Sequence, residues 1–210
     1  MMPGIRFELA RTQEKVDAFG HYMDEFFIGP NYHHRFGNLS MTLSVWYYFA
    51  GFDIIEDKYV ATHNLEFVPV FNYRLGPVIL TSRSIFHNIL YSGLYEGPAS
   101  ARRGYSLVVR QLFQLGIRVH PKLTLLVASE PFFCLVEDAD AKPSYLGFWR
   151  SGFRIHRLYG GVALPLGKGL TLVPQWIYEV LLEDGEKDNG VLHHGHYLFV
   201  VLSYRFRLFG

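Results

Sequence analysis

The sequence predicts an all-β protein: a transmembrane antiparallel up-and-down β-barrel of about ten strands, with short periplasmic turns and long extracellular loops. Three observations predict it. Apolar and polar residues alternate with a period of two, tight turns alternate with longer connections, and most alternating segments exceed ten residues. Soluble strands usually have about five or six residues, whereas a tilted strand crossing a bilayer needs about 9 to 11. We expect one such barrel domain over residues 1–210.

The alternation can be followed from segment to segment. In residues 39–49 the odd-numbered positions are apolar, and Ser and Thr fill several even-numbered ones. In residues 64–75 the polar parity includes Glu66 and Arg74, and in residues 107–118 it includes Arg110, Gln114 and Arg118. Residues 170–180 and 197–208 follow the same rule. Each segment therefore predicts a strand with one apolar and one polar face.

The connections between these segments are of two kinds. Tight turns containing Gly, Pro or Asn are predicted at residues 36–38, 75–77, 120–122 and 166–169. Longer connections are predicted at residues 12–22, 51–58, 92–104, 137–148 and 184–195. This order predicts an even number of strands, with both chain ends on the tight-turn side.

Composition excludes several other classes. No stretch approaches the roughly 18 consecutive apolar residues of a membrane-spanning helix. The net charge of +1 does not favour a nucleic-acid partner. The single cysteine, Cys134, permits no internal disulfide. The opening residues MMPGIRFELA lack the basic segment and apolar run of a secretory signal.

Charge chemistry predicts which face is inside. All six lysines fall in predicted loops and turns, whereas the predicted strands carry arginine together with glutamate. A planar guanidinium satisfies several acceptors at once, which suits a confined interior better than a water-facing wall. We therefore expect a polar lumen. Its predicted lining residues are Glu66, Arg83, Arg110, Gln114, Glu130, Arg157, Gln175, Glu179 and Arg205.

The apolar face is expected to contact outer-membrane lipid. It carries many aromatic residues, and those near strand ends are typical of the girdles at a bilayer surface. Its prolines, Pro30, Pro69, Pro131 and Pro174, are expected at bulges or at the barrel rim. The long connections are rich in Asp and Glu, so they are a candidate contact for lipopolysaccharide through divalent cations, although simple solvation explains them as well.

Several motifs carry a family resemblance. The segments HNLEFVPVFNYRLG, LVASEPFF and FRIHRLYGGVALPLGKGLTLVPQWIYE resemble a family of small bacterial outer-membrane barrels known as domain of unknown function 2490. The resemblance covers most of the chain from about residue 24. It implies a fold and a location in the bacterial outer membrane, and no activity. The ending YLFVVLSYRFRLFG also resembles the terminal strands that the barrel-assembly machinery recognises, which makes that machinery an expected partner.

Two groups of residues are candidates for chemistry. His193, His194 and His196 fall in the last predicted long connection and are a weak candidate for a transition-metal site. A lipid-modifying hydrolase would need a serine and a histidine side by side at the membrane surface. The candidates for such a pair are Ser82, Ser84, Ser129, His63 and His87. Ser84 and His87 are separated by an odd number of residues, so they are expected on opposite faces.

The functional prediction is a small outer-membrane barrel with a structural, binding or narrow-pore role, and with no cofactor. A lipid A deacylase or phospholipase is the alternative. A soluble lipocalin-like ligand-binding barrel is the second alternative, and it would require lysine-bearing strands. The sequence leaves open whether the lumen is filled, which solute it takes, and the oligomeric state.

Overall fold

The computed structural model describes residues 4–12, 23–55, 58–92, 105–136, 151–182 and 191–204. These residues form ten strands and, among them, no helix that is long and apolar enough to cross a membrane. The strands are β1 (Gly4–Thr12), β2 (Met23–Phe36), β3 (Leu39–Ile55), β4 (Lys58–Leu75), β5 (Val78–Ser92), β6 (Ser106–His120), β7 (Leu123–Val136), β8 (Gly152–Gly167), β9 (Leu170–Leu182) and β10 (Val191–Tyr204).

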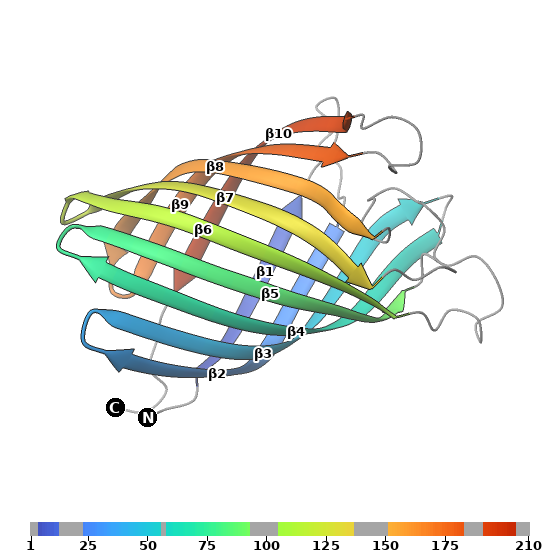
Figure 1. Ribbon diagram of the computed structural model, residues 1–210, viewed down its shortest axis with the longest axis horizontal. Helices are drawn as coiled ribbons and strands as arrows, with labels where there is room; N and C mark the ends of the chain where they lie inside the picture. Colours follow the sequence, from blue (N-terminus) through green and yellow to red (C-terminus); the bar gives the residue numbers. More distant parts are fainter. Residues whose placement is uncertain are drawn as a thin grey trace.

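The strands form a single antiparallel sheet in which each pairs with its neighbours in chain order, from β1 to β10. The sheet curls into a barrel, so that β1 lies on the wall opposite β5 and β6 (Figure 1). The all-β, up-and-down barrel fold expected from the sequence is thereby confirmed, including its ten strands.

All four predicted tight turns are present at one end of the barrel, at residues 37–38, 76–77, 121–122 and 168–169. Gly37 and Gly76 have φ of 56°, while Lys168 and Gly169 have φ of 50° and 82°. Positive φ matches the twist of a two-residue hairpin, and glycine adopts it without a steric penalty. These turns set the register of four hairpins.

Side-chain exposure shows which face of the sheet is inside. In β4, Leu65 and Phe67 are 42% and 41% exposed, whereas the intervening Glu66 is 1% exposed. The same contrast separates Phe113, 59% exposed, from the buried Leu112 in β6. The apolar parity of the strands therefore faces outward, and the charged parity faces the interior.

The interior also contains apolar side chains. Trp46, Val68 and Ile85 form one buried cluster, against which Phe27 packs. A second buried cluster comprises Ile89, Val108, Phe132, Cys134, Ile155 and Leu181. These side chains lie inside because polar-parity residues of several strands are themselves apolar. The interior is thus partly filled.

The outward prolines lie within strands and not at the barrel rim. The pairing of β2 with β3 passes from Ile28 to Asn31 and so omits Pro30. The pairing of β4 with β5 passes from Phe67 to Val70 and so omits Pro69. Pro131 and Pro174 fall in equivalent gaps of the β6–β7 and β8–β9 pairings. Proline has no N–H to donate to the ladder, so each interrupts pairing on one side only.

Two predicted boundaries differ from the structure. Strand β3 ends at Ile55 and strand β4 begins at Lys58, so most of the predicted connection 51–58 belongs to these strands. Lys58 is therefore a strand residue, contrary to the expectation that every lysine lies in a loop or turn. Strand β10 begins at Val191, within the connection predicted for residues 184–195.

Candidate functional site: the interior charge network

The predicted lumen residues that the structure describes all belong to the inward parity of their strands. These residues are Glu66, Arg83, Arg110, Gln114, Glu130, Arg157, Gln175 and Glu179. Arg205 lies outside the described residues. Six strands, from β4 to β9, thus contribute to one interior region.

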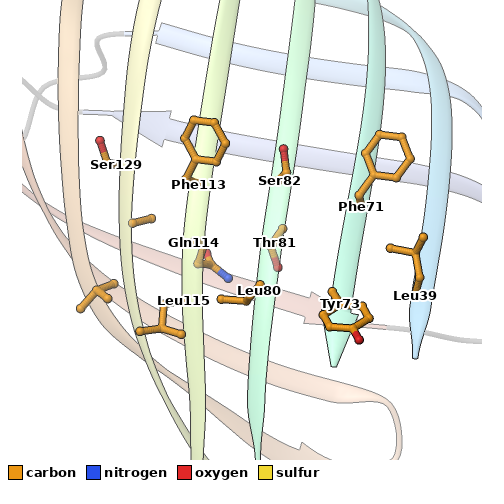
Figure 2. A pocket seen from close by; sticks show the side chains of 12 residues that line it. Leu39, Phe71, Tyr73, Leu80, Thr81, Ser82, Phe113, Gln114, Leu115 and Ser129 are labelled. Carbon is orange, nitrogen blue, oxygen red and sulfur yellow. The ribbon is translucent and has the colours of Figure 1, made fainter. Parts of the chain in front are cut away.

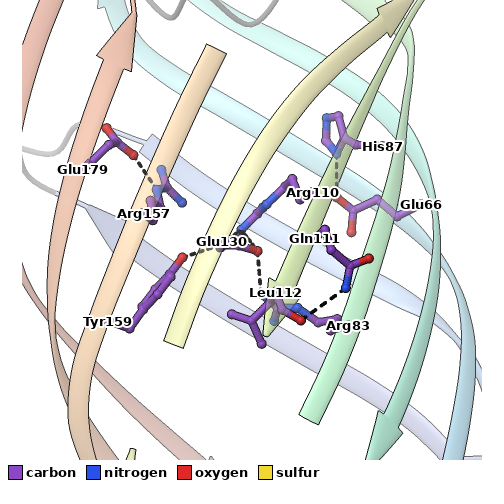
Figure 3. A network of polar contacts seen from close by, with 10 residues as sticks. All are labelled: Glu66, Arg83, His87, Arg110, Gln111, Leu112, Glu130, Arg157, Tyr159 and Glu179. Carbon is purple, nitrogen blue, oxygen red and sulfur yellow. Dashed lines mark hydrogen bonds and ion pairs between the residues drawn. The ribbon is translucent and has the colours of Figure 1, made fainter. Parts of the chain in front are cut away.

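Glu130 is the centre of this region. Its carboxylate accepts a hydrogen bond from Arg83 Nη2 at 2.8 Å, one from Arg110 Nη2 at 3.2 Å and one from the Tyr159 hydroxyl (Figure 3). The Glu130 side chain is fully buried. Its charge is therefore held by two guanidiniums and a phenol instead of water, which is the condition under which a buried carboxylate is tolerated.

A second carboxylate extends the network toward β10. Glu179 forms an ion pair with Arg157, which lies directly opposite it in the β8–β9 register. Glu179 also accepts a hydrogen bond from the Tyr197 hydroxyl at 3.4 Å. The Tyr197 ring occupies the space beside Gly195, where a Cβ would collide with it. Gly195 therefore lets a large side chain of β10 reach the interior.

A third carboxylate, Glu66, pairs with His87 at 2.5 Å. His87 was a candidate base for Ser84, but the two residues face opposite sides of β5. His87 points inward to Glu66, and Ser84 donates a hydrogen bond to Gln111 on the outer face at 2.5 Å. The expectation from their odd separation agrees with these contacts.

Phe132 organises the two most buried guanidiniums. Arg110 Cζ and Arg157 Cζ lie 4.6 Å and 4.9 Å from the centre of its ring, and the ring itself is buried. The ring face attracts each cation and fixes the position of both. Sequence reasoning missed Phe132 and Tyr159. The parity of each within its strand is the available signal, but the predicted lining used it for arginine, glutamate and glutamine only.

The outer wall carries a separate group of polar side chains. Ser129 Oγ lies 2.8 Å from His156 Nε2, and both side chains face outward from β7 and β8. Beside them a groove of about 600 Å³ crosses β3 to β7, bordered by Phe71 and Phe113, with Ser82 and Ser129 among its lining (Figure 2). His156 was not a predicted partner of Ser129, because only the β7–β8 register brings them together.

The histidines of the weak metal candidate lie in β10 and not in a loop. His194 and His196 share the outer face, where His194 Nδ1 is 2.7 Å from the Tyr178 hydroxyl and His196 stacks on Trp176. The side chain of His193 lies outside the described part of the structure. Among the described residues, no three His, Cys, Asp or Glu side chains are placed to hold a metal ion. This pair is better understood as part of an aromatic surface.

Of the acidic residues of the long connections, Asp53 lies in β3 with its side chain outside the described part of the structure, and the others lie outside the described residues. The expected contact with lipopolysaccharide through them stays a prediction.

Comparisons with known proteins add little beyond the architecture. Neither protein-family models nor curated proteins match the chain. Among solved structures, one titled "NanC porin structure in rhombohedral crystal form" is similar, with a TM-score of 0.42 and 11% identity over 88% of this chain and 97% of that chain. The resemblance to the domain of unknown function 2490 family stays a prediction.

Proposed function

We propose that the chain is a bacterial outer-membrane barrel whose charged interior forms a narrow, solvated passage for small polar solutes. One observation supports this above the others: the exterior is apolar and the interior is charged. Trp176, Phe113 and Leu198 are 47%, 59% and 78% exposed, whereas the carboxylates of Glu66 and Glu130 are buried inside.

The arrangement suits a bilayer and not water. A continuous apolar wall in water favours aggregation. In a bilayer the same wall contacts apolar lipid chains, so its exposure carries no penalty. Charged side chains in lipid are expensive, and here they face a shared interior. A soluble ligand-binding barrel would have the opposite sense, with its apolar face inward.

The passage is narrow because apolar side chains share the interior with the network. Trp46 and Phe132 project inward, and both are buried by their neighbours. Arg83, Arg110 and Arg157 nevertheless keep a quarter to a third of their side-chain surface accessible to solvent. There is therefore room for water beside the network, and only small solutes would fit there.

Conductance across a planar lipid bilayer tests this proposal. We expect small, uniform current steps when the purified barrel inserts, and larger steps for Arg110→Ala, which removes a bulky side chain from the interior. Gln111→Ala changes a side chain on the outer face of the same strand and should leave the step size unchanged. Absence of steps from barrel that is demonstrably folded and inserted would contradict the passage and support a filled structural barrel.

A second candidate function is hydrolysis of lipid esters on the outer wall, and the Ser129–His156 contact favours it. His156 Nε2 would take the hydroxyl proton as Ser129 Oγ attacks an ester carbonyl, and would return it to the departing alcohol. Water would then cleave the acyl-serine, releasing a fatty acid. The adjacent apolar groove would hold the acyl chain.

Fatty-acid release from phospholipid or lipid A in detergent micelles tests the second candidate. We expect release by the unmodified barrel and none by Ser129→Ala or His156→Ala. Ser82→Ala is the matched control, because Ser82 lines the same groove but contacts Gln111 and not a histidine. Release that is absent, or that survives Ser129→Ala, would remove this candidate.

A further inference from the structure

The cations and the anions of the interior network differ in how much solvent reaches them. The side chains of Arg83, Arg110 and Arg157 are 33%, 25% and 27% exposed. The side chains of the three glutamates in the same region, Glu130, Glu179 and Glu66, are only 0%, 12% and 2% exposed. The numbers of arginines and glutamates in the network are equal, but the surface that solvent touches is cationic.

The mouth of the barrel at the tight-turn end is also cationic. Arg35, Arg74 and Arg118 occupy the inward parity close to the turns, and all three are exposed. Lys122 and Lys168 add two exposed cations in the turns themselves. In the described residues of this end, spanning 31–44, 71–82, 116–127, 162–174 and 195–204, there is no Asp or Glu. Among the described side chains of this end, therefore, no carboxylate neutralises these cations.

From these two observations we infer that the passage is selective for anions, and that small oxyanions such as phosphates and carboxylates are its preferred class of solute. The inference rests on the proposed function, because it requires a solvated passage. The mouth concentrates anions at the tight-turn end, since clustered charge of one sign raises the local concentration of its counter-ion. Inside, the guanidiniums offer several N–H donors in a planar fork, which fits an oxyanion better than a spherical halide.

The positions of the side chains explain why the glutamates do not offset the positive potential that the arginines give to the interior surface. Glutamate is the shorter side chain, so Glu130 stays against the wall, where Arg83, Arg110 and Tyr159 surround its carboxylate. Phe132 holds Arg110 and Arg157 in place by their faces. Arg110 gives Nη2 to Glu130 and Arg157 gives Nε to Glu179, and each guanidinium keeps further N–H groups for other acceptors. A passing anion meets guanidinium groups, while among the described glutamates of the network none offers a passing cation a carboxylate of comparable exposure.

The magnitude of the effect follows from Coulomb's law. In water, one unit charge at about 6 Å from the path changes the occupancy of a monovalent ion roughly threefold. We therefore expect removal of one exposed arginine to lower the anion-to-cation permeability ratio by about threefold at low ionic strength. The effect should shrink in 1 M salt, where screening acts within about 3 Å.

Reversal potentials in planar bilayers separated by a KCl gradient test the inference. We expect the sign that chloride permeation produces, and a smaller potential for Arg83→Gln and for the double variant Arg74→Gln, Arg118→Gln. Arg74→Lys with Arg118→Lys is the matched control, because it keeps both charges and should keep the potential. Because Arg74 and Arg118 are exposed at the mouth, their variants retain the fold and keep the test decisive if Arg83→Gln does not fold.

Inorganic phosphate distinguishes oxyanion binding from simple anion preference. Adding phosphate to chloride solution should reduce the chloride current of the unmodified barrel, and should do so less in Arg83→Gln. A reversal potential of the cation-selective sign, or one that the glutamine variants leave unchanged, would overturn anion selectivity while leaving the passage intact. A chloride current that phosphate does not reduce would overturn the oxyanion preference. Absence of any current would instead overturn the passage itself.

Discussion

Replacing Glu130 by glutamine should destabilise the barrel, because Glu130 is the one acceptor shared by Arg83, Arg110 and Tyr159. The substitution keeps the shape of the side chain but removes its charge and turns one acceptor atom into a donor facing guanidinium N–H groups. Removing one partner of a buried ion pair typically costs about 3–5 kcal/mol. Solvent reaches both arginines and compensates part of this, so we expect a loss of about 2 kcal/mol for Glu130→Gln.

Equilibrium unfolding by urea in lipid vesicles measures the effect, with the loss of heat-modifiable gel mobility as a second reporter of folding. Gln114→Ala is the matched control: it changes an uncharged interior residue on the neighbouring strand β6, and we expect a loss below about 1 kcal/mol. Combining Glu130→Gln with Tyr159→Phe should cost less than the sum of the single changes, since both remove the same hydrogen bond. If Glu130→Gln unfolds at the same urea concentration as the unmodified barrel, the network does not contribute to stability as argued.

Three further outcomes follow from packing and orientation. Gly161→Ala should cost about 1–3 kcal/mol in the same urea assay, because its Cβ would lie 2.6 Å from a backbone carbonyl of β9. At the adjacent Gly160 the atom nearest to a Cβ is 3.9 Å away, so Gly160→Ala should be tolerated. Equal stability of the two variants would contradict this packing. In variants that retain a single tryptophan, brominated acyl chains should quench the fluorescence of Trp176 but not that of Trp46, and the reverse result would mean that the apolar face is inside. Cys134 forms no disulfide and its buried thiol faces the interior, so it should react with a maleimide only after unfolding, and rapid labelling of the folded barrel would refute its burial.

Much of the fold could be predicted because strand periodicity and turn chemistry are local properties. The alternation in residues 64–75 is sufficient to assign Glu66 to the inside and Phe67 to the outside, and glycine marks most of the tight turns. The inward placement of the charged residues followed from the same periodicity, together with the preference for arginine over lysine in the strands.

Contacts between strands joined by a long connection could not be predicted, because such a connection does not fix their register. Ser129 and His156 meet through the β7–β8 pairing, which the length of the intervening connection does not determine. The pairing of His87 with Glu66, by contrast, follows from the tight turn between β4 and β5, because the register that starts at Leu75 and Val78 reaches this pair before the irregularity next to His63 and Asn64. Local reasoning also assumed that a polar-parity position is polar, and so it missed Phe132, whose ring positions two of the arginines.

The near-zero net charge of the chain conceals a separation of charge that only the fold produces. The sequence contains 20 basic and 19 acidic residues, which predicts no preference for either sign of solute. The strands place arginine and glutamate on the same inward face, where the difference in side-chain length decides which of them solvent reaches. Glu130 is covered by its partners, and Arg83 keeps a third of its surface. A lysine in place of Arg83 could not divide its contacts in this way, because a single ammonium cannot present one edge to Glu130 and another to the passage. The use of arginine in the strands is therefore connected with the sign of the interior surface as well as with its stability.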